Sequence, residues 1–178
     1  MSTVLPAVHS HPVALSRWWE LVVGLHVASV VVGFGIVFAY PLFMTVGARI
    51  DPFAMPWFHQ MQQAVSRRLV SPALVLVVIF GVALASKLNA WSTFYVGWGI
   101  GVSIVIGALE GMVLIPRAGR LAELARRDLD DHRPGARGVH GALGAEYHGV
   151  RRQVLIVSAL ISLLVLATII VMALHVRG

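Results

Sequence analysis

The chain has 178 residues, of which 58% are hydrophobic and 12% are charged, and its mean hydropathy is +0.82. About a quarter of the residues of an ordinary soluble domain are charged, so this composition excludes a soluble globular protein and indicates a membrane protein. The sequence has no cysteine, which excludes disulfide bonds and thiolate chemistry. The net charge of +6 lies beside apolar segments, where basic residues set membrane orientation, so it calls for no nucleic-acid partner.

Four apolar segments are long enough to cross a bilayer, since about 20 helical residues span its hydrocarbon core. Backbone groups in lipid must pair within their own segment, so each segment is expected to be helical. The sequence therefore predicts an all-α fold, a single domain built as an integral membrane four-helix bundle. The expected transmembrane helices cover residues 18–44, 69–86, 91–116 and 153–175.

Residues 1–17 precede the first of these helices and are expected to form a loose outer tail. They contain two prolines and show no hydrophobic periodicity. They hold no basic residue before Arg17, and the following apolar run is too long for a signal-peptide core, so no cleaved signal peptide is predicted. Trp18 and Trp19 then mark the membrane interface, where indole rings prefer to lie.

His26 lies inside the first apolar segment. At helical spacing Ser29, Gly33 and Tyr40 share its face, so this face is expected to turn toward the bundle and away from lipid. One interpretation is a neutral histidine that is hydrogen-bonded to a facing hydroxyl or carbonyl group. The other is a ligand of haem or a metal ion, because neutral imidazole is the commonest metal ligand and intramembrane ionisable residues are functional candidates by default.

The loop after the first span contains a predicted helix over the sequence WFHQMQQAVSRR. Pro56 is tolerated in the first turn of such a helix. The helix is expected to lie along the inner membrane surface until the chain enters the second span near Pro72. Its apolar face would consist of Phe58, Met61, Val65 and Leu69.

The third span combines small residues with one ionisable residue. The pairs Gly97/Gly101 and Gly107/Gly111 have the spacing that lets helices approach closely in lipid. Glu110 lies about two helical turns before Arg117. One interpretation is a structural carboxylate that pairs with an arginine of the first loop (Arg49, Arg67 or Arg68) or reaches the inner interface. The other is a proton or cation site that serves transport.

Residues 117–152 form a basic loop whose first part, RAGRLAELARRDL, is predicted to be an amphipathic helical extension of the third span. Four histidines fall in the polar loops and are expected to be exposed: His59, His132, His140 and His148. Lysine and arginine total eleven in the loops after the first and third spans and three on the opposite side. This bias predicts a bacterial inner-membrane protein with cytoplasmic basic loops beside anionic inner-leaflet lipid, and with both termini outside.

The fourth span carries Thr168, Met172 and His175 on one face. His26 is expected roughly 11 Å below the outer surface, from about 1.5 Å of rise per residue. His175 would lie at the rim, and Met172 about one turn deeper. Met172 or His175 is therefore the expected second ligand if His26 binds haem b or copper, since both donors suit these groups.

Several motifs resemble a bacterial family of integral membrane proteins filed as domain of unknown function 2269. They are LHV with a nearby glycine pair in the first helix, SPALVLVVIFGVAL in the second, and IPRAGRLAEL after the third. The resemblance covers residues 18–176. More distantly, the chain is similar to copper-resistance D proteins and to HemJ-type protoporphyrinogen oxidases, whose first-helix histidine is associated with haem binding and matches His26. The additional charged residues of those oxidases in the membrane helices are not evident here, so the resemblance does not imply oxidase activity.

Three classes of function follow from the sequence. The first is a membrane protein that binds haem b or copper through His26. The second is a small transporter or channel subunit, in which Glu110 and the glycine-rich third span would line a path. The third is an accessory scaffold that packs against a second copy or a membrane partner. Motifs for soluble catalysis are absent, and nothing in the sequence assigns an enzymatic activity.

Overall fold

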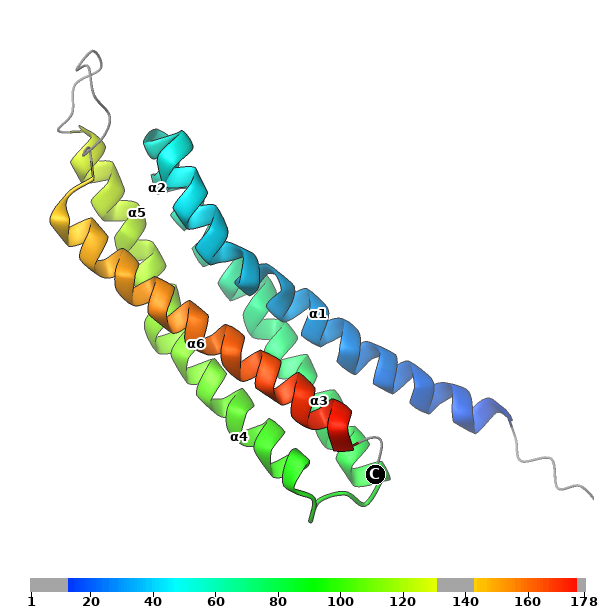
Figure 1. Cartoon of the computed structure of the whole chain (residues 1–178). Helices are drawn as coiled ribbons and strands as arrows, with labels where there is room; N and C mark the ends of the chain where they lie inside the picture. The colour runs from blue at the N-terminus through cyan, green and yellow to red at the C-terminus, as the bar shows by residue number, and fades with distance from the viewer. Residues whose placement is uncertain (1–12, 131–142, 176–178) are drawn as a thin grey trace, which may run out of the picture.

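The computed structural model describes residues 13–130 and 143–175, with side chains for 18–130 and 143–174. These residues form four long helical columns that run alternately up and down and pack together (Figure 1). Each column is long and apolar enough to cross a membrane, which confirms the predicted all-α four-helix architecture. The elements are α1 (Val13–Ile50), η1 (Pro52–Ala54), α2 (Met55–Val65), η2 (Ser66–Val70), α3 (Ser71–Lys87), α4 (Phe94–Leu109), η3 (Glu110–Leu114), α5 (Ile115–Asp130) and α6 (Ala145–His175).

The second and third columns each contain several of these elements. The second runs through α2, η2 and α3, and the third runs through α4, η3 and α5. α1 begins at Val13, inside the stretch that was expected to be a tail, while residues 1–12 lie outside the described residues. The short η1 turn joins the first two columns, and the Asp51 carboxylate caps it by accepting a hydrogen bond from the Phe53 N–H at 2.9 Å.

The columns are longer than a bilayer is thick. Their spans of 30 to 37 residues correspond to about 45–55 Å of helix, whereas a hydrocarbon core is about 30 Å thick. Much of the additional helix lies at one end of the bundle. This end holds α2, α5, the last turns of α1 and the first turns of α6 (Figure 1). We call this the charged end. The opposite end holds the α3–α4 connection, the start of α1 and the end of α6, and we call it the loop end.

Both interrupted columns contain a π-helical turn, and each turn is followed by a proline. η2 ends at Val70, two residues before Pro72, and η3 ends at Leu114, two residues before Pro116. A proline has no N–H to donate to the preceding turn, and its ring clashes with the carbonyl four residues before it. A widened turn relieves that clash while the helix continues. The second column therefore passes through Pro72 without breaking.

The helix predicted in the first loop exists, but it does not lie along the membrane surface. α2 continues α3 along the bundle axis and packs against α5. Its buried face consists of Met55, His59 and Gln62, in place of the expected apolar face. The amphipathic α5 buries Leu121 and Leu124, so the two segments beyond the membrane cover each other's faces. The predicted extension of the third span is confirmed, and it forms part of the bundle.

α1 approaches α3 closely at one level and diverges from the bundle toward the loop end (Figure 1). At the close approach, a Cβ atom added to Gly33 would lie 2.7 Å from the Cβ of Ala73. Nearer the N-terminus, Lys87 Nζ lies 5.4 Å from the centroid of the Trp19 ring, a cation–π contact between the first two columns. α1 is thus held against α3 at two levels.

The glycine pairs of the third span contribute less to packing than their spacing suggests. A Cβ atom at Gly97, Gly101 or Gly111 would meet nothing within 4 Å. Only Gly107 of the four faces a neighbour, with Leu74 Cδ2 3.2 Å from its hypothetical Cβ. The prediction of helix packing through these pairs is therefore wrong within the described chain for three of the four glycines.

Candidate functional site

A cavity of about 380 Å³ lies at the loop end, between α1, α3, α4 and α6. Ligand pockets of proteins have volumes of about 300–1,000 Å³ and are mainly apolar with a few polar groups. The cavity walls follow this pattern, because valine, leucine, isoleucine and alanine side chains make up most of them. Its polar lining residues are His26, Tyr95 and Ser103, and Met172 contributes a thioether.

His26 is oriented by the backbone of α3. Its Nδ1 lies 3.1 Å from the carbonyl oxygen of Val77, so Nδ1 carries the proton and donates the hydrogen bond in the neutral ring. The remaining lone pair is then on Nε2. A Cβ atom at Gly81 would lie 3.4 Å from His26 Cε1, so this glycine leaves room for the ring against α3. Metal-binding histidines are commonly fixed in this way, with one ring nitrogen held by a carbonyl and the other left to the ligand.

Met172 lines the same cavity from α6. A Cβ atom at Gly99 would lie 2.8 Å from Met172 Cε, so this glycine of α4 makes room for the thioether as Gly81 does for the imidazole. The structure therefore places His26 and Met172, two of the three expected ligands, on walls of one cavity. His175 is the last residue of α6, and its side chain lies outside those that the structure describes.

The face of α1 that carries His26 turns inward, as its spacing predicts. Ser29, Gly33 and Tyr40 are all buried. Ser29 donates to the carbonyl of Leu25 in its own helix at 2.7 Å, so its hydroxyl is not the partner of the imidazole. The partner is the backbone carbonyl of Val77, one of the two alternatives that the sequence suggested.

These donors suit haem better than copper. An imidazole with an available Nε2 and a thioether in one apolar cavity match the His/Met ligation of some haem proteins. A copper site would draw on several close donors, and the described residues contain no group of three or more His, Cys, Asp or Glu side chains that could hold a metal ion. The cavity is large and apolar, which a flat macrocycle requires and a small ion does not.

A second polar region surrounds Glu110, about midway along the bundle. Glu110 is the first residue of η3, and its side chain is only 3% exposed. Ser66, the first residue of η2, lies near both the Glu110 carboxyl group and the Tyr40 hydroxyl group. Neither Glu110 Oε1 nor the Tyr40 hydroxyl has a hydrogen-bond partner of good geometry among the described residues. The described salt bridges do not include the expected pair between Glu110 and Arg49, Arg67 or Arg68.

A buried hydrogen-bonded pair lies nearer the charged end. His59 Nε2 is 2.8 Å from the Tyr147 hydroxyl, and His59 Nδ1 is 3.4 Å from Gln62 Oε1. His59 and Tyr147 are both fully buried. The prediction of an exposed loop histidine is therefore wrong for His59, because α5 and α6 cover this face of α2. It is right for His148, which is exposed, while His132 and His140 lie outside the described residues.

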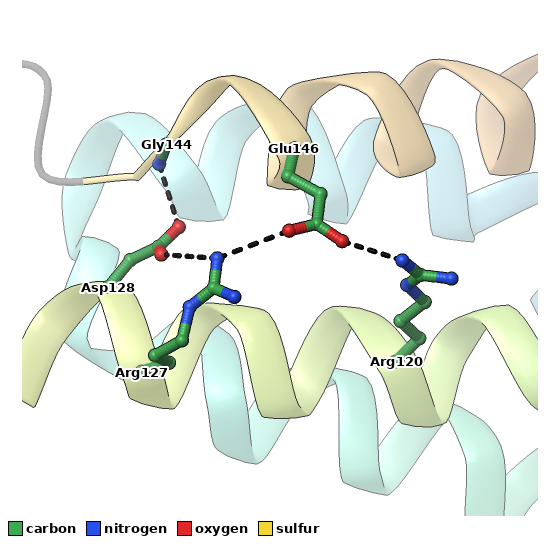
Figure 2. A network of polar contacts seen from close by, with 5 residues as sticks. All are labelled: Arg120, Arg127, Asp128, Gly144 and Glu146. Atoms are coloured by element: carbon green, nitrogen blue, oxygen red, sulfur yellow. Dashed lines mark hydrogen bonds and ion pairs between the residues drawn. The ribbon is translucent and has the colours of Figure 1, made fainter.

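The charged end is closed by a network of polar contacts between α5 and α6 (Figure 2). Glu146 bridges Arg120 at 2.6 Å and Arg127 at 3.3 Å, and Arg127 also contacts Asp128. Asp128 accepts a hydrogen bond from the Gly144 N–H at 2.7 Å, just before α6 begins. A negative charge at this position is favourable because it lies at a helix N-terminus. The network joins the two helices that flank residues 131–142.

The chain matches no protein-family model, and no curated protein or solved structure is significantly similar to it. The resemblance to the family filed as domain of unknown function 2269 stays a prediction. Four packed columns that are each able to span a bilayer establish the broader class. The protein is a small multi-pass membrane protein.

Proposed function

We propose that this protein binds haem b in the cavity at the loop end, with His26 as an axial ligand and Met172 as the candidate second ligand. The observation that carries the proposal is the fixed tautomer of His26. Its Nδ1–H is engaged by the Val77 carbonyl, so Nε2 is available on a ring that lines a large apolar cavity. Bound haem b would supply one-electron redox chemistry.

The ligand would reach this cavity from the lipid phase. Val23 and Val27 line the cavity, yet they are 47% and 53% exposed on α1. Their exposed surfaces lie within an apolar membrane span, where the neighbouring phase is hydrocarbon. The apolar edge of a porphyrin ring that enters from the bilayer would therefore reach His26 without crossing a polar barrier.

The test is a haem titration of the purified protein in mild detergent, followed by its visible absorption spectrum. The wild-type protein should give a shifted Soret band that saturates at one haem per chain. His26→Leu should weaken binding by about tenfold or more, since even losing the partner that orients a metal ligand costs 10–100-fold. Met172→Leu should keep the haem but change its spin state, because only the second ligand is lost.

The matched control is His148→Leu, which removes an exposed histidine of the charged end. It should bind haem as the wild type does. A wild-type protein that remains colourless throughout the titration would refute the proposal and leave His26 as a packing histidine. A haem band that is unchanged in His26→Leu would show that another residue is the axial ligand.

In this proposal the charged end faces the cytoplasm and both termini lie outside. The support is the distribution of basic residues, eleven in the loops of the charged end against three at the loop end. The haem would then lie in the outer half of the membrane. A periplasm-dependent reporter fused after Gly178 should be active, and a cytoplasm-dependent reporter at the same position should be silent. The reverse pattern would invert the orientation.

A further inference from the structure

Glu110 is the one carboxyl group that the described structure buries within the apolar part of the bundle without a salt bridge. It is 3% exposed, and Oε1 has no hydrogen-bond partner among the described residues. The only other buried carboxylate among these residues, Asp128, lies at the charged end beside Arg127. Glu110 therefore needs an explanation that Asp128 does not.

The surroundings of Glu110 are built from both π-helical turns. η2 and η3 start on buried polar residues, Ser66 and Glu110, and these two residues lie near each other. The turns are also joined by Gln63, whose side-chain amide donates to the carbonyl of Ile115 at 3.1 Å. Tyr40 of α1 adds a second hydroxyl group beside Ser66. π-Helical turns are uncommon and are frequent at functional sites.

We propose that Glu110 is a proton-binding site of the membrane domain, which holds a proton at rest and exchanges it with the aqueous phase at the charged end. An ionised carboxylate without a partner is very unfavourable in an apolar interior, so the neutral acid is the form that fits this position. Proton uptake converts the carboxylate and a hydronium ion into the carboxylic acid and water. The acid can then donate one hydrogen bond to a neighbouring hydroxyl oxygen.

A metal ion fits this position less well than a proton. A divalent cation would bring several carboxylates or carbonyl oxygens together, and Glu110 belongs to no such group among the described residues. The oxygens that the structure places beside Glu110 are the hydroxyl groups of Ser66 and Tyr40. These are enough to hydrogen-bond a carboxylic acid.

The buried polar side chains of the second column lie level with Glu110 or nearer the charged end. His59, Gln62 and Ser66 follow one another at intervals of about one helical turn along its buried face. Toward the loop end, the core positions next to Glu110 include the apolar Val37 and Ile106. A proton that arrives from the charged end would therefore find hydrogen-bonding groups along the second column.

Charged and titratable groups near the site come from several elements but leave Glu110 unpaired. Tyr40 faces it from α1, and His59 lies two turns nearer the charged end on α2. Arg151 of α6 interacts with His59 and Tyr147, so its charge also lies nearer the charged end than Glu110 does. On the flanking turns Arg67 and Arg68 are exposed, and Arg117 donates to Gln153.

The first experiment uses dicyclohexylcarbodiimide, an apolar reagent that adds to protonated carboxyl groups in apolar surroundings. The full-length protein in liposomes is labelled over a range of pH and digested for mass spectrometry. Glu110 should be labelled at neutral pH, with labelling falling at least tenfold at high pH, while the exposed, ion-paired Glu146 stays unlabelled. Absence of label on Glu110 at every pH would overturn the proposal.

The second experiment follows the carboxylic-acid C=O band by infrared difference spectroscopy. The wild type should show a band that shifts in D₂O, and Glu110→Gln should lack it. Gln62→Leu should slow deuterium exchange of this band about tenfold, whereas Gln60→Leu, on the opposite side of the same helix and partly exposed, should leave the rate unchanged. Equal rates in both glutamine variants would overturn access along the His59–Gln62–Ser66 face.

Discussion

The cavity at the loop end and the polar region around Glu110 each place one ionisable side chain inside an apolar bundle. The two side chains are accommodated in different ways. His26 can be neutral while it donates a hydrogen bond to a backbone carbonyl, so it tolerates an open cavity beside it. Glu110 has a carboxyl oxygen without a hydrogen-bond partner among the described residues, and its side chain is buried. The loop end leaves space beside its ionisable group, as the haem proposal requires, whereas the middle of the bundle packs closely around its own, as the proton proposal requires.

The largest expected effect tests the tight packing between the first two columns. Gly33→Ala would place a Cβ atom 2.7 Å from the Cβ of Ala73, and neither atom can move without its helix. We expect a loss of about 1–3 kcal/mol in the free energy of unfolding, as for other overpacked positions. Chemical unfolding in detergent measures it, and the double variant Gly33→Ala/Ala73→Gly should recover most of the loss. No recovery in the double variant would mean that the contact is not the cause.

A comparable effect is expected at the buried pair of the charged end. His59→Leu leaves the buried Tyr147 hydroxyl without its 2.8 Å partner, which should cost about 1–3 kcal/mol of unfolding free energy. Tyr147→Phe should lose a similar amount, and the double variant should lose less than the sum. Haem titration of His59→Leu should match the wild type, because the pair is distant from the cavity. Additive losses in the double-mutant cycle would show that the two side chains are not coupled.

The third prediction makes the same substitution as the first at the loosely packed end. A Cβ atom at Gly99 would lie 2.8 Å from Met172 Cε, but this atom is the end of a flexible side chain that borders the cavity. Gly99→Ala should therefore cost less than about 1 kcal/mol, since methionine adapts to small changes in volume. Its measurable effect should be a changed Soret position after haem titration. A loss as large as that of Gly33→Ala would contradict the contrast between the two regions.

The smallest effect is expected at the surface network of the charged end. Glu146→Gln removes two exposed salt bridges, to Arg120 and to Arg127, which should reduce the unfolding free energy less than any of the substitutions above. The difference from wild type should shrink as salt is added, because exposed ion pairs are screened. A difference that does not change with salt would indicate that Glu146 acts through packing instead of charge.

Much of the fold could be predicted from the sequence because lipid leaves few alternatives. The length and apolarity of the segments predicted the four columns, and helical spacing predicted that the His26 face points inward. The cavity could not be predicted, since it depends on how α1, α3, α4 and α6 pack together. The burial of His59 was not predicted because its helix was expected to lie along the membrane surface, whereas α2 packs against α5. The available signal was a stripe of polar side chains, His59, Gln62 and Ser66, at intervals of three and four residues.

The two π-helical turns also left a signal that periodicity alone does not reveal. Ser66 and Glu110 each stand six residues before a proline, Pro72 and Pro116, and each begins the turn that accommodates it. Proline was treated as the start of a span or as its end. In a membrane helix it can also mark a widened turn within a continuous column, because neighbouring helices stabilise the interruption.

The contact between Lys87 and Trp19 has a consequence for how quickly the cavity exchanges its contents. At exposed sites a cation–π contact contributes about 0.5–1 kcal/mol, which is a two- to fivefold preference for the closed arrangement. At that preference, the contact between Lys87 and Trp19 is broken in roughly one molecule in three to one in six. The start of α1 can therefore move away from α3 without unfolding the bundle. The residence time of a bound haem would then depend on its bond to His26 more than on the walls of the cavity.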